Sequence, residues 1–144
     1  LQKKFGKNTI YISQDMVRRQ ILMVDDGNDT LALPLMKEML SYGSRNSEVV
    51  ILEGIMYADW YRTLFVQAKE LYRDNIYAYY FDIPFEETVR RHQMRDKRNE
   101  FGAEAMRKWW REKDYSDVLD ERTIGLECDK DSIVNKIYCD VMGV

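Results

Sequence analysis

Residues 49–54 read Val-Val-Ile-Leu-Glu-Gly, and this stretch decides how the chain is expected to fold. Four consecutive apolar residues, three of them β-branched, predict a short strand that is buried on both sides. A charged residue and a glycine then end the strand. Three further apolar runs predict strands at residues 9–12, 76–81 and 123–127.

The segments around these strands predict helices, because apolar residues recur in them at three- and four-residue steps. Apolar strands that alternate with helices predict an α/β fold, a parallel sheet with helices on both faces. The expected helices start at about Asp15, cover 29–42, include 60–72, open at Pro84, run over a charged stretch at 100–113, and include 133–141.

Composition limits the classes of protein that fit. The 144 residues, 45% hydrophobic and 33% charged, predict one globular domain over 1–144. A net charge of -3 argues against a nucleic-acid partner, which needs surplus positive charge. No apolar run is long enough to span a membrane. Cys128 and Cys139 predict reduced thiols in a cytoplasmic protein, and with a single histidine no metal-site spacing appears.

Acidic residues follow each predicted strand, where a parallel sheet gathers its ligands. Asp15 could act as a general base or bind a substrate hydroxyl, with Arg18 and Arg19 one turn later to hold an anion. It could also simply cap a helix. Two arginines in a first helical turn do not suit the helix dipole, which favours the functional interpretation.

Glu53 ends its strand where a carboxylate could orient a substrate or hold a magnesium ion through water. The alternative is a polar residue that merely ends a buried strand. Asp82, which is followed by Ile-Pro, is typical of turn chemistry.

Residues 84–98 place Arg91 and Arg95 one helical turn apart, and Arg98 continues that face. Like charges at this spacing cost about 0.2–0.5 kcal/mol per pair, so the helix gains nothing from them alone. A polyphosphate laid across them would reverse that sign. The alternative is a solvated face.

On such a solvated face, ion pairs Glu86–Arg90 and Glu87–Arg91 would form at i,i+4 spacing. That account leaves the arginines after residue 94 without partners in the preceding turn. Downstream, Arg107, Lys108 and Arg111 flank two tryptophans. This segment is either a lid that closes basic groups over phosphates or a helix whose tryptophans dock on the body.

Taken together, these residues resemble the P-loop kinases of small molecules, in the adenylate-kinase-like, uridine-kinase-like and zeta-toxin-like groups. The likeness covers nearly the whole chain, and residues 84–95, PFEETVRRHQMR, carry its most specific motif. It implies a three-layer P-loop kinase architecture. No G-x-x-x-x-G-K-[ST] motif occurs, so the resemblance implies a first strand and phosphate-binding loop upstream, with residues 1–6 ending the helix that leaves the loop.

In that family the first strand lies in the middle of a five-stranded sheet, between two of the strands present here and two others, and its absence would leave a central gap. The resemblance implies that Asp15 takes or orients the acceptor's proton and that Glu53 lies beside substrate and magnesium. Other roles it implies are substrate binding by Arg18 and Arg19, base stacking by Arg91, phosphate contact and catalysis by Arg95, nucleotide contact by Arg98, adenine binding at Asp129 and Lys130, and lid contacts by Arg107 and Arg111.

The function implied is that of an ATP- and Mg²⁺-dependent kinase, which transfers a phosphoryl group in line to a hydroxyl or phosphate of a nucleoside, nucleotide or nucleotide sugar. Residues 1–144 alone are expected to turn over no substrate. The alternative is a non-catalytic nucleotide-binding or regulatory domain without the phosphate loop, and a weaker one is a toxin-type kinase acting on a cell-wall precursor. The sequence leaves the acceptor and the oligomeric state open.

Overall fold

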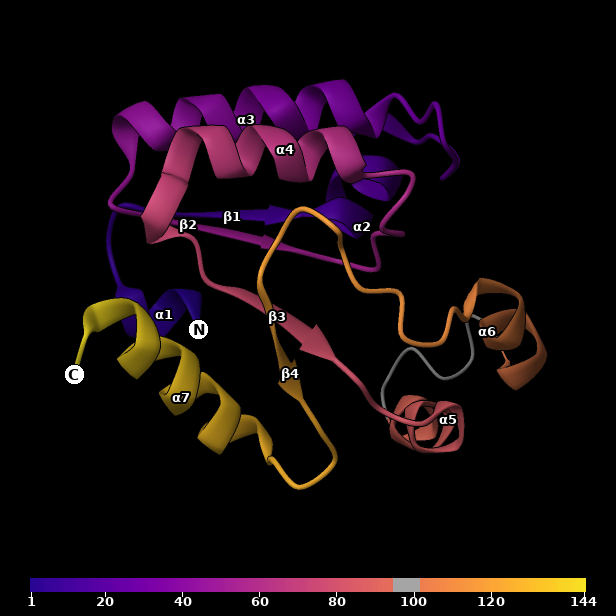
Figure 1. Ribbon diagram of the computed structural model, residues 1–144. Coiled ribbons are helices and arrows are strands. Elements are labelled where there is room, and N and C mark those ends of the chain that lie inside the picture. The colour runs from indigo at the N-terminus through magenta and orange to yellow at the C-terminus, as the bar shows by residue number, and fades with distance from the viewer. Residues whose placement is uncertain (95–101) are drawn as a thin grey trace.

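The computed structural model describes residues 1–94 and 102–144, and Figure 1 shows helices and strands alternating along them. The predicted α/β class is confirmed. The elements are α1 (Gln2–Phe5), β1 (Thr9–Ser13), α2 (Gln14–Met16), the π-helix η1 (Val17–Leu22), α3 (Ala32–Asn46), β2 (Val49–Glu53), α4 (Arg62–Tyr72), the 3-10 helix η2 (Arg73–Asn75), β3 (Ala78–Phe81), α5 (Phe85–Gln93), α6 (Ala103–Trp109), β4 (Glu121–Ile124) and α7 (Lys130–Met142).

The strands of the described segments form two separate parallel pairs. In the first pair β1 lies beside β2, with Ser13 opposite Glu53. In the second β3 lies beside β4, with Phe81 opposite Ile124. The predicted parallel pairing is therefore confirmed, whereas the single continuous sheet is not present among residues 1–94 and 102–144. Figure 1 shows the β3–β4 pair below β1 and β2.

Several boundaries differ from the sequence prediction for local reasons. β4 ends at Ile124 rather than 127, where its carbonyl accepts a bond from the Asp82 amide (3.0 Å). α3 begins at Ala32 rather than 29, after a turn in which the Thr30 hydroxyl accepts from the Ala32 amide (3.3 Å). The helix expected from Asp15 is one α-turn followed by η1.

The core lies between the β1–β2 pair and the helices α3 and α4, which Figure 1 shows together on one side of these strands. Ile12, Met36 and Leu64 are completely buried there. Gly43 lets α3 approach β2 closely, since a Cβ at this position would lie 2.6 Å from Cγ2 of Val50. The core therefore depends on one small residue as well as on apolar ones.

The opposite face of β1–β2 is partly open, so the predicted covering of both faces is not confirmed for this pair. Tyr11, at the middle of β1, is 38% exposed. Together with Leu1, Gln2 and Ile51 it lines a hollow of about 240 Å³. The reason is that α3 and α4, which pack on these strands, both use the other face.

Asp140 of α7 binds side chains of both strands of the second pair. The Tyr79 hydroxyl donates to Oδ2 of Asp140 (2.6 Å), and Arg122 pairs with the same carboxylate (2.8 Å). Burial and the Asp140 carboxylate raise the pKa of Tyr79 to about 12. Cys128 and Cys139 are both free.

Candidate functional site

The carboxyl end of β1 holds Asp15 in an ion-pair cluster. Its Oδ1 accepts from Nε of Arg19 at 2.7 Å and from Nη2 of Arg18 at 3.3 Å. The helix-capping alternative for Asp15 is not what the structure has, because the Ser13 hydroxyl is the cap and accepts from the Met16 amide (3.4 Å). The Asp15 carboxylate is thus held by two guanidinium groups at the end of a strand.

Arg18 is the more buried of these two arginines. Its side chain is 16% exposed, compared with 43% for Arg19. Nη1 reaches the Val24 carbonyl at 3.5 Å, while Nε is buried and has no acceptor among the described residues. A buried guanidinium with an unused N–H can donate a hydrogen bond to an added anion.

Glu53 lies at the matching end of the neighbouring strand, opposite Ser13. Its Oε1 accepts from the Tyr11 hydroxyl at 2.7 Å, and burial together with this bond raises the pKa of Tyr11. Gly54 follows with φ of +147°, and a Cβ there would lie 2.6 Å from Cβ of Gln14. Glycine therefore allows the two strand ends to touch.

A buried hydrogen-bond chain supports this edge. Nε2 of Gln14 donates to the Tyr61 hydroxyl (2.9 Å), which donates to Oδ1 of Asp26 (2.6 Å). Gln14 is 3% exposed and Tyr61 is fully buried. Burial and the Asp26 bond raise the pKa of Tyr61. The sequence predicts only a packing role for Tyr61, because this residue is one of the apolar positions that recur at three- and four-residue steps in the predicted helix over 60–72.

The arginines of α5 are engaged by one carboxylate. Nε of Arg91 lies 2.7 Å from Oε1 of Glu87, as the solvated-face alternative predicted. Arg90 also binds Glu87, at 2.6 Å and 2.7 Å, so the predicted Glu86–Arg90 pair is replaced by an i,i+3 pair. These bonds lower the pKa of Glu87 to about 2. Arg95 and Arg98 lie outside the described residues.

Residues after α6 dock on the segment that follows β2. Arg111 binds Oδ1 of Asp59 at 2.6 Å, and its guanidinium lies 3.7 Å from the centre of the Tyr57 ring. The Tyr57 hydroxyl donates to the Trp109 carbonyl at 2.6 Å. The structure therefore shows this part of the predicted lid docked on the body, with Arg111 committed to Asp59.

Asp129 and Lys130, expected beside adenine, are part of the start of α7. Oδ1 of Asp129 accepts from the Asp131 and Ser132 amides at 2.9 Å and 3.0 Å, and the Ser132 bonds lower the pKa of Asp129. Asp129 is a helix cap in this arrangement. Lys130 is exposed and is the first residue of the helix.

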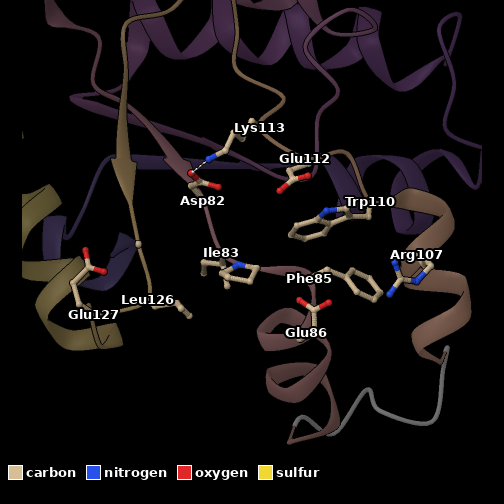
Figure 2. A pocket seen from close by; sticks show the side chains of 12 residues that line it. Asp82, Ile83, Phe85, Glu86, Arg107, Trp110, Glu112, Lys113, Leu126 and Glu127 are labelled. Atoms are coloured by element: carbon tan, nitrogen blue, oxygen red, sulfur yellow. Dashed lines mark hydrogen bonds and ion pairs between the residues drawn. The ribbon is translucent and has the colours of Figure 1, made fainter.

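A cavity of about 570 Å³ lies at the carboxyl ends of β3 and β4 (Figure 2). It combines aromatic and apolar walls with charged side chains. Of the residues with predicted roles, Arg107 lines it, whereas Asp15, Glu53 and Arg91 do not. The lining residues are Asp82, Ile83, Pro84, Phe85, Glu86, Arg107, Trp110, Glu112, Lys113, Gly125, Leu126 and Glu127.

The structure thus presents two separate groups of candidate residues, one at the carboxyl ends of β1 and β2 and one around the cavity at the ends of β3 and β4. Asp15, Arg18 and Arg19 are in contact at the end of β1, and Glu53 lies at the end of the adjoining strand. Among residues 1–94 and 102–144, no cluster of three or more His, Cys, Asp or Glu side chains could hold a metal ion.

Comparisons with protein-family models, with curated proteins and with solved structures found no match to this chain. In the described part of the chain, every helix is too short or too polar to cross a membrane.

Proposed function

We propose that this protein is an ATP-dependent phosphotransferase of the P-loop kinase type, which acts on a hydroxyl or phosphate of a nucleoside, nucleotide or nucleotide sugar. The observation that carries the proposal is the cluster at the carboxyl end of β1, where two guanidinium groups hold the Asp15 carboxylate. The two parallel strand pairs also support it, because the resemblance implies a central strand between them.

In this proposal Asp15 binds the acceptor hydroxyl and takes its proton. The Asp15 side chain is 45% exposed, so a substrate can reach it. Its contacts with Arg18 and Arg19 use Oδ1, and Oδ2 is the oxygen that would face the acceptor. A carboxylate within hydrogen-bond distance of a hydroxyl is suited to general-base catalysis. The same arginines would also attract an anionic group on the acceptor.

Glu53 would orient the acceptor or a magnesium-bound water. Its Oε1 is fixed by Tyr11, which leaves Oε2 for a ligand. Mg²⁺ in kinases keeps several waters and takes most other ligands from the nucleotide phosphates, so one protein carboxylate fits its chemistry. The ion would supply charge neutralisation on the transferring group.

Nucleotide contacts are assigned to the second half of the chain. Arg91, Arg95 and Arg98 would meet the base and phosphates, with Arg107 as a further cation. Arg91 is available only if the nucleotide competes with Glu87 for its guanidinium. Asp129 and Lys130 would contribute through backbone near adenine.

A non-catalytic nucleotide-binding domain is the second candidate. It is favoured by the sequence of residues 1–144, which holds no glycine-rich loop with its lysine. It predicts ATP binding without transfer.

The test is an acceptor screen with the protein as it is expressed from its gene. Nucleosides, nucleotides and sugar nucleotides are incubated with Mg²⁺ and γ-labelled ATP, and ATP affinity is measured by calorimetry. The kinase proposal predicts a labelled product, and Glu53→Gln raises the Mg²⁺ concentration needed for half-maximal rate. ATP binding without any product supports the second candidate, and absence of ATP binding contradicts both.

A further inference from the structure

The cavity at the ends of β3 and β4 has an aromatic wall that already holds a cation. The rings of Phe85 and Trp110 meet edge to face, with centroids 5.4 Å apart. The guanidinium carbon of Arg107 lies 4.2 Å from the centre of the Phe85 ring. Aromatic faces attract cations through their quadrupole, and guanidinium groups stack on them well. This wall is therefore chemically suited to a guanidinium group.

The charges around the cavity favour a cation as well. Asp82 and Lys113 form an ion pair at 2.9 Å and largely cancel each other. Arg107 is the other cation of the lining, and three glutamates remain. Among the described residues these glutamates have no ion pair; they are Glu86, Glu112 and Glu127. Figure 2 shows them on different sides of the cavity, so the excess of negative charge is distributed around it.

Apolar residues complete the space between these charges. Ile83 and Leu126 line it from the segments that follow the two strands. Leu126 is 48% exposed, which leaves apolar surface for the body of a ligand. The lining thus offers contacts for both a charged head and a hydrocarbon stem.

We propose that this cavity binds a small organic cation that carries a guanidinium group. Its planar head would stack on the Trp110 ring rather than on the Phe85 ring that Arg107 already holds, and a carboxylate such as Glu112 would accept its N–H groups in a bidentate pair. The site goes beyond phosphoryl transfer: it shares no residue with the Asp15 cluster, and Arg107 is the one lining residue to which the proposed function also gives a role.

The test uses argininamide and citrullinamide, which have nearly the same shape but differ in charge. Binding to the protein is measured by calorimetry, and the site is located from NMR shifts of the Trp110 indole N–H. Argininamide is expected to bind at least about fivefold more tightly than citrullinamide. Glu112→Gln is expected to remove most of that preference, because it replaces a charged acceptor with a neutral one of equal size.

Glu104→Gln is the matched control, since Glu104 is exposed on α6 and does not line the cavity. It is expected to leave argininamide binding unchanged. Equal binding of the two compounds, no binding of argininamide at millimolar concentration, or equal effects of the two substitutions would each overturn the proposal. Loss of ATP binding or phosphoryl transfer would not, because the proposed function gives no role to Glu112 or Trp110 and uses Arg107 alone among the lining residues.

Discussion

At the scale of single residues, the Tyr61 hydroxyl connects three segments of the chain. It accepts from Gln14 and donates to Asp26 while its ring is fully buried in the core. Gln14 immediately precedes Asp15, so this hydroxyl also holds the start of the candidate site. Removing this hydroxyl would leave Gln14 and Asp26 without their partner, which is costly for buried polar groups. A substitution that removes the hydroxyl and keeps the ring therefore measures the hydrogen bonds alone.

We therefore predict that Tyr61→Phe lowers the free energy of unfolding by about 1–3 kcal/mol, although the ring stays in place. Urea unfolding followed by circular dichroism measures the change. Tyr42→Phe is the control, because Tyr42 is 55% exposed and its ring hydroxyl lies outside the core. Equal unfolding midpoints for the two variants would contradict the assigned role.

Glu87 provides a pH-dependent prediction. Its bonds to Arg90 and Arg91 lower its pKa from an ordinary 4.5 to about 2. A carboxyl whose pKa is lowered in the folded state stabilises that state above the unfolded pKa, and the contribution is lost as the pH falls through the folded value. The stabilisation from Glu87 is therefore complete above about pH 5 and disappears toward pH 2.

An NMR titration of the Glu87 carboxyl carbon measures this pKa directly. In Glu87→Gln the corresponding loss of stability between about pH 5 and pH 2 should be absent. An inflection above pH 4 in the unmodified protein would show that the arginines do not hold this carboxylate. The Arg90 and Arg91 guanidinium groups of α5 would then lack their ion pairs with Glu87.

At the scale of elements, close approach of α3 to β1 and β2 depends on Gly43. A Cβ there would lie 2.6 Å from Cγ2 of Val50 and 3.1 Å from Cγ2 of Ile10. Gly43→Ala is predicted to destabilise the protein by about 1–2 kcal/mol, since overpacking outweighs the gain in helix propensity. Thermal unfolding measures the effect. Ser44→Ala, on the exposed side of the same helix, should change little, and a stabilised Gly43→Ala variant would refute the packing argument.

The elements also show what the sequence can and cannot specify. Apolar runs located β1, β2 and β3, because buried strands need consecutive apolar residues, whereas β4 begins at the charged pair Glu121-Arg122 and shares only two residues with the predicted run. The predicted end of β4 at residue 127 is wrong. The strand ends at Ile124, whose carbonyl accepts from the Asp82 amide, and Gly125 lies outside it. The partners of Arg91 followed from i,i+4 spacing, whereas those of Arg111 could not, because Asp59 and Tyr57 lie far away in the sequence.

At the scale of the whole molecule, the segment after α6 joins the two strand pairs. Oδ2 of Asp114 accepts from the Ala58 amide at 3.0 Å, beyond the end of β2. The Asp114 amide donates to the Tyr80 hydroxyl of β3 at 3.0 Å. One residue therefore contacts both halves of the fold, and its side chain makes the bond to the first.

Replacing Asp114 with alanine should remove the side-chain bond to the Ala58 amide and keep the backbone bond to the Tyr80 hydroxyl. We expect faster hydrogen exchange at the Ala58 amide and faster proteolysis between residues 109 and 117, with a cost of about 1 kcal/mol. Mass spectrometry of exchange and cleavage reports both effects. Asp120→Ala, at an exposed position of the same segment, should leave both rates as they are. Unchanged protection of Ala58 in Asp114→Ala would exclude this connection.

The central claim is that Asp15, held by Arg18 and Arg19, serves the acceptor in phosphoryl transfer. The most direct measurement is the rate at which the protein expressed from its gene transfers the γ-phosphate of Mg²⁺-ATP to a mixture of nucleosides and nucleotides. Asp15→Asn is predicted to lower this rate about 100-fold or more with ATP affinity unchanged, while Asp29→Asn, in an exposed turn, leaves it intact. Equal rates for Asp15→Asn and the unmodified protein would contradict the claim.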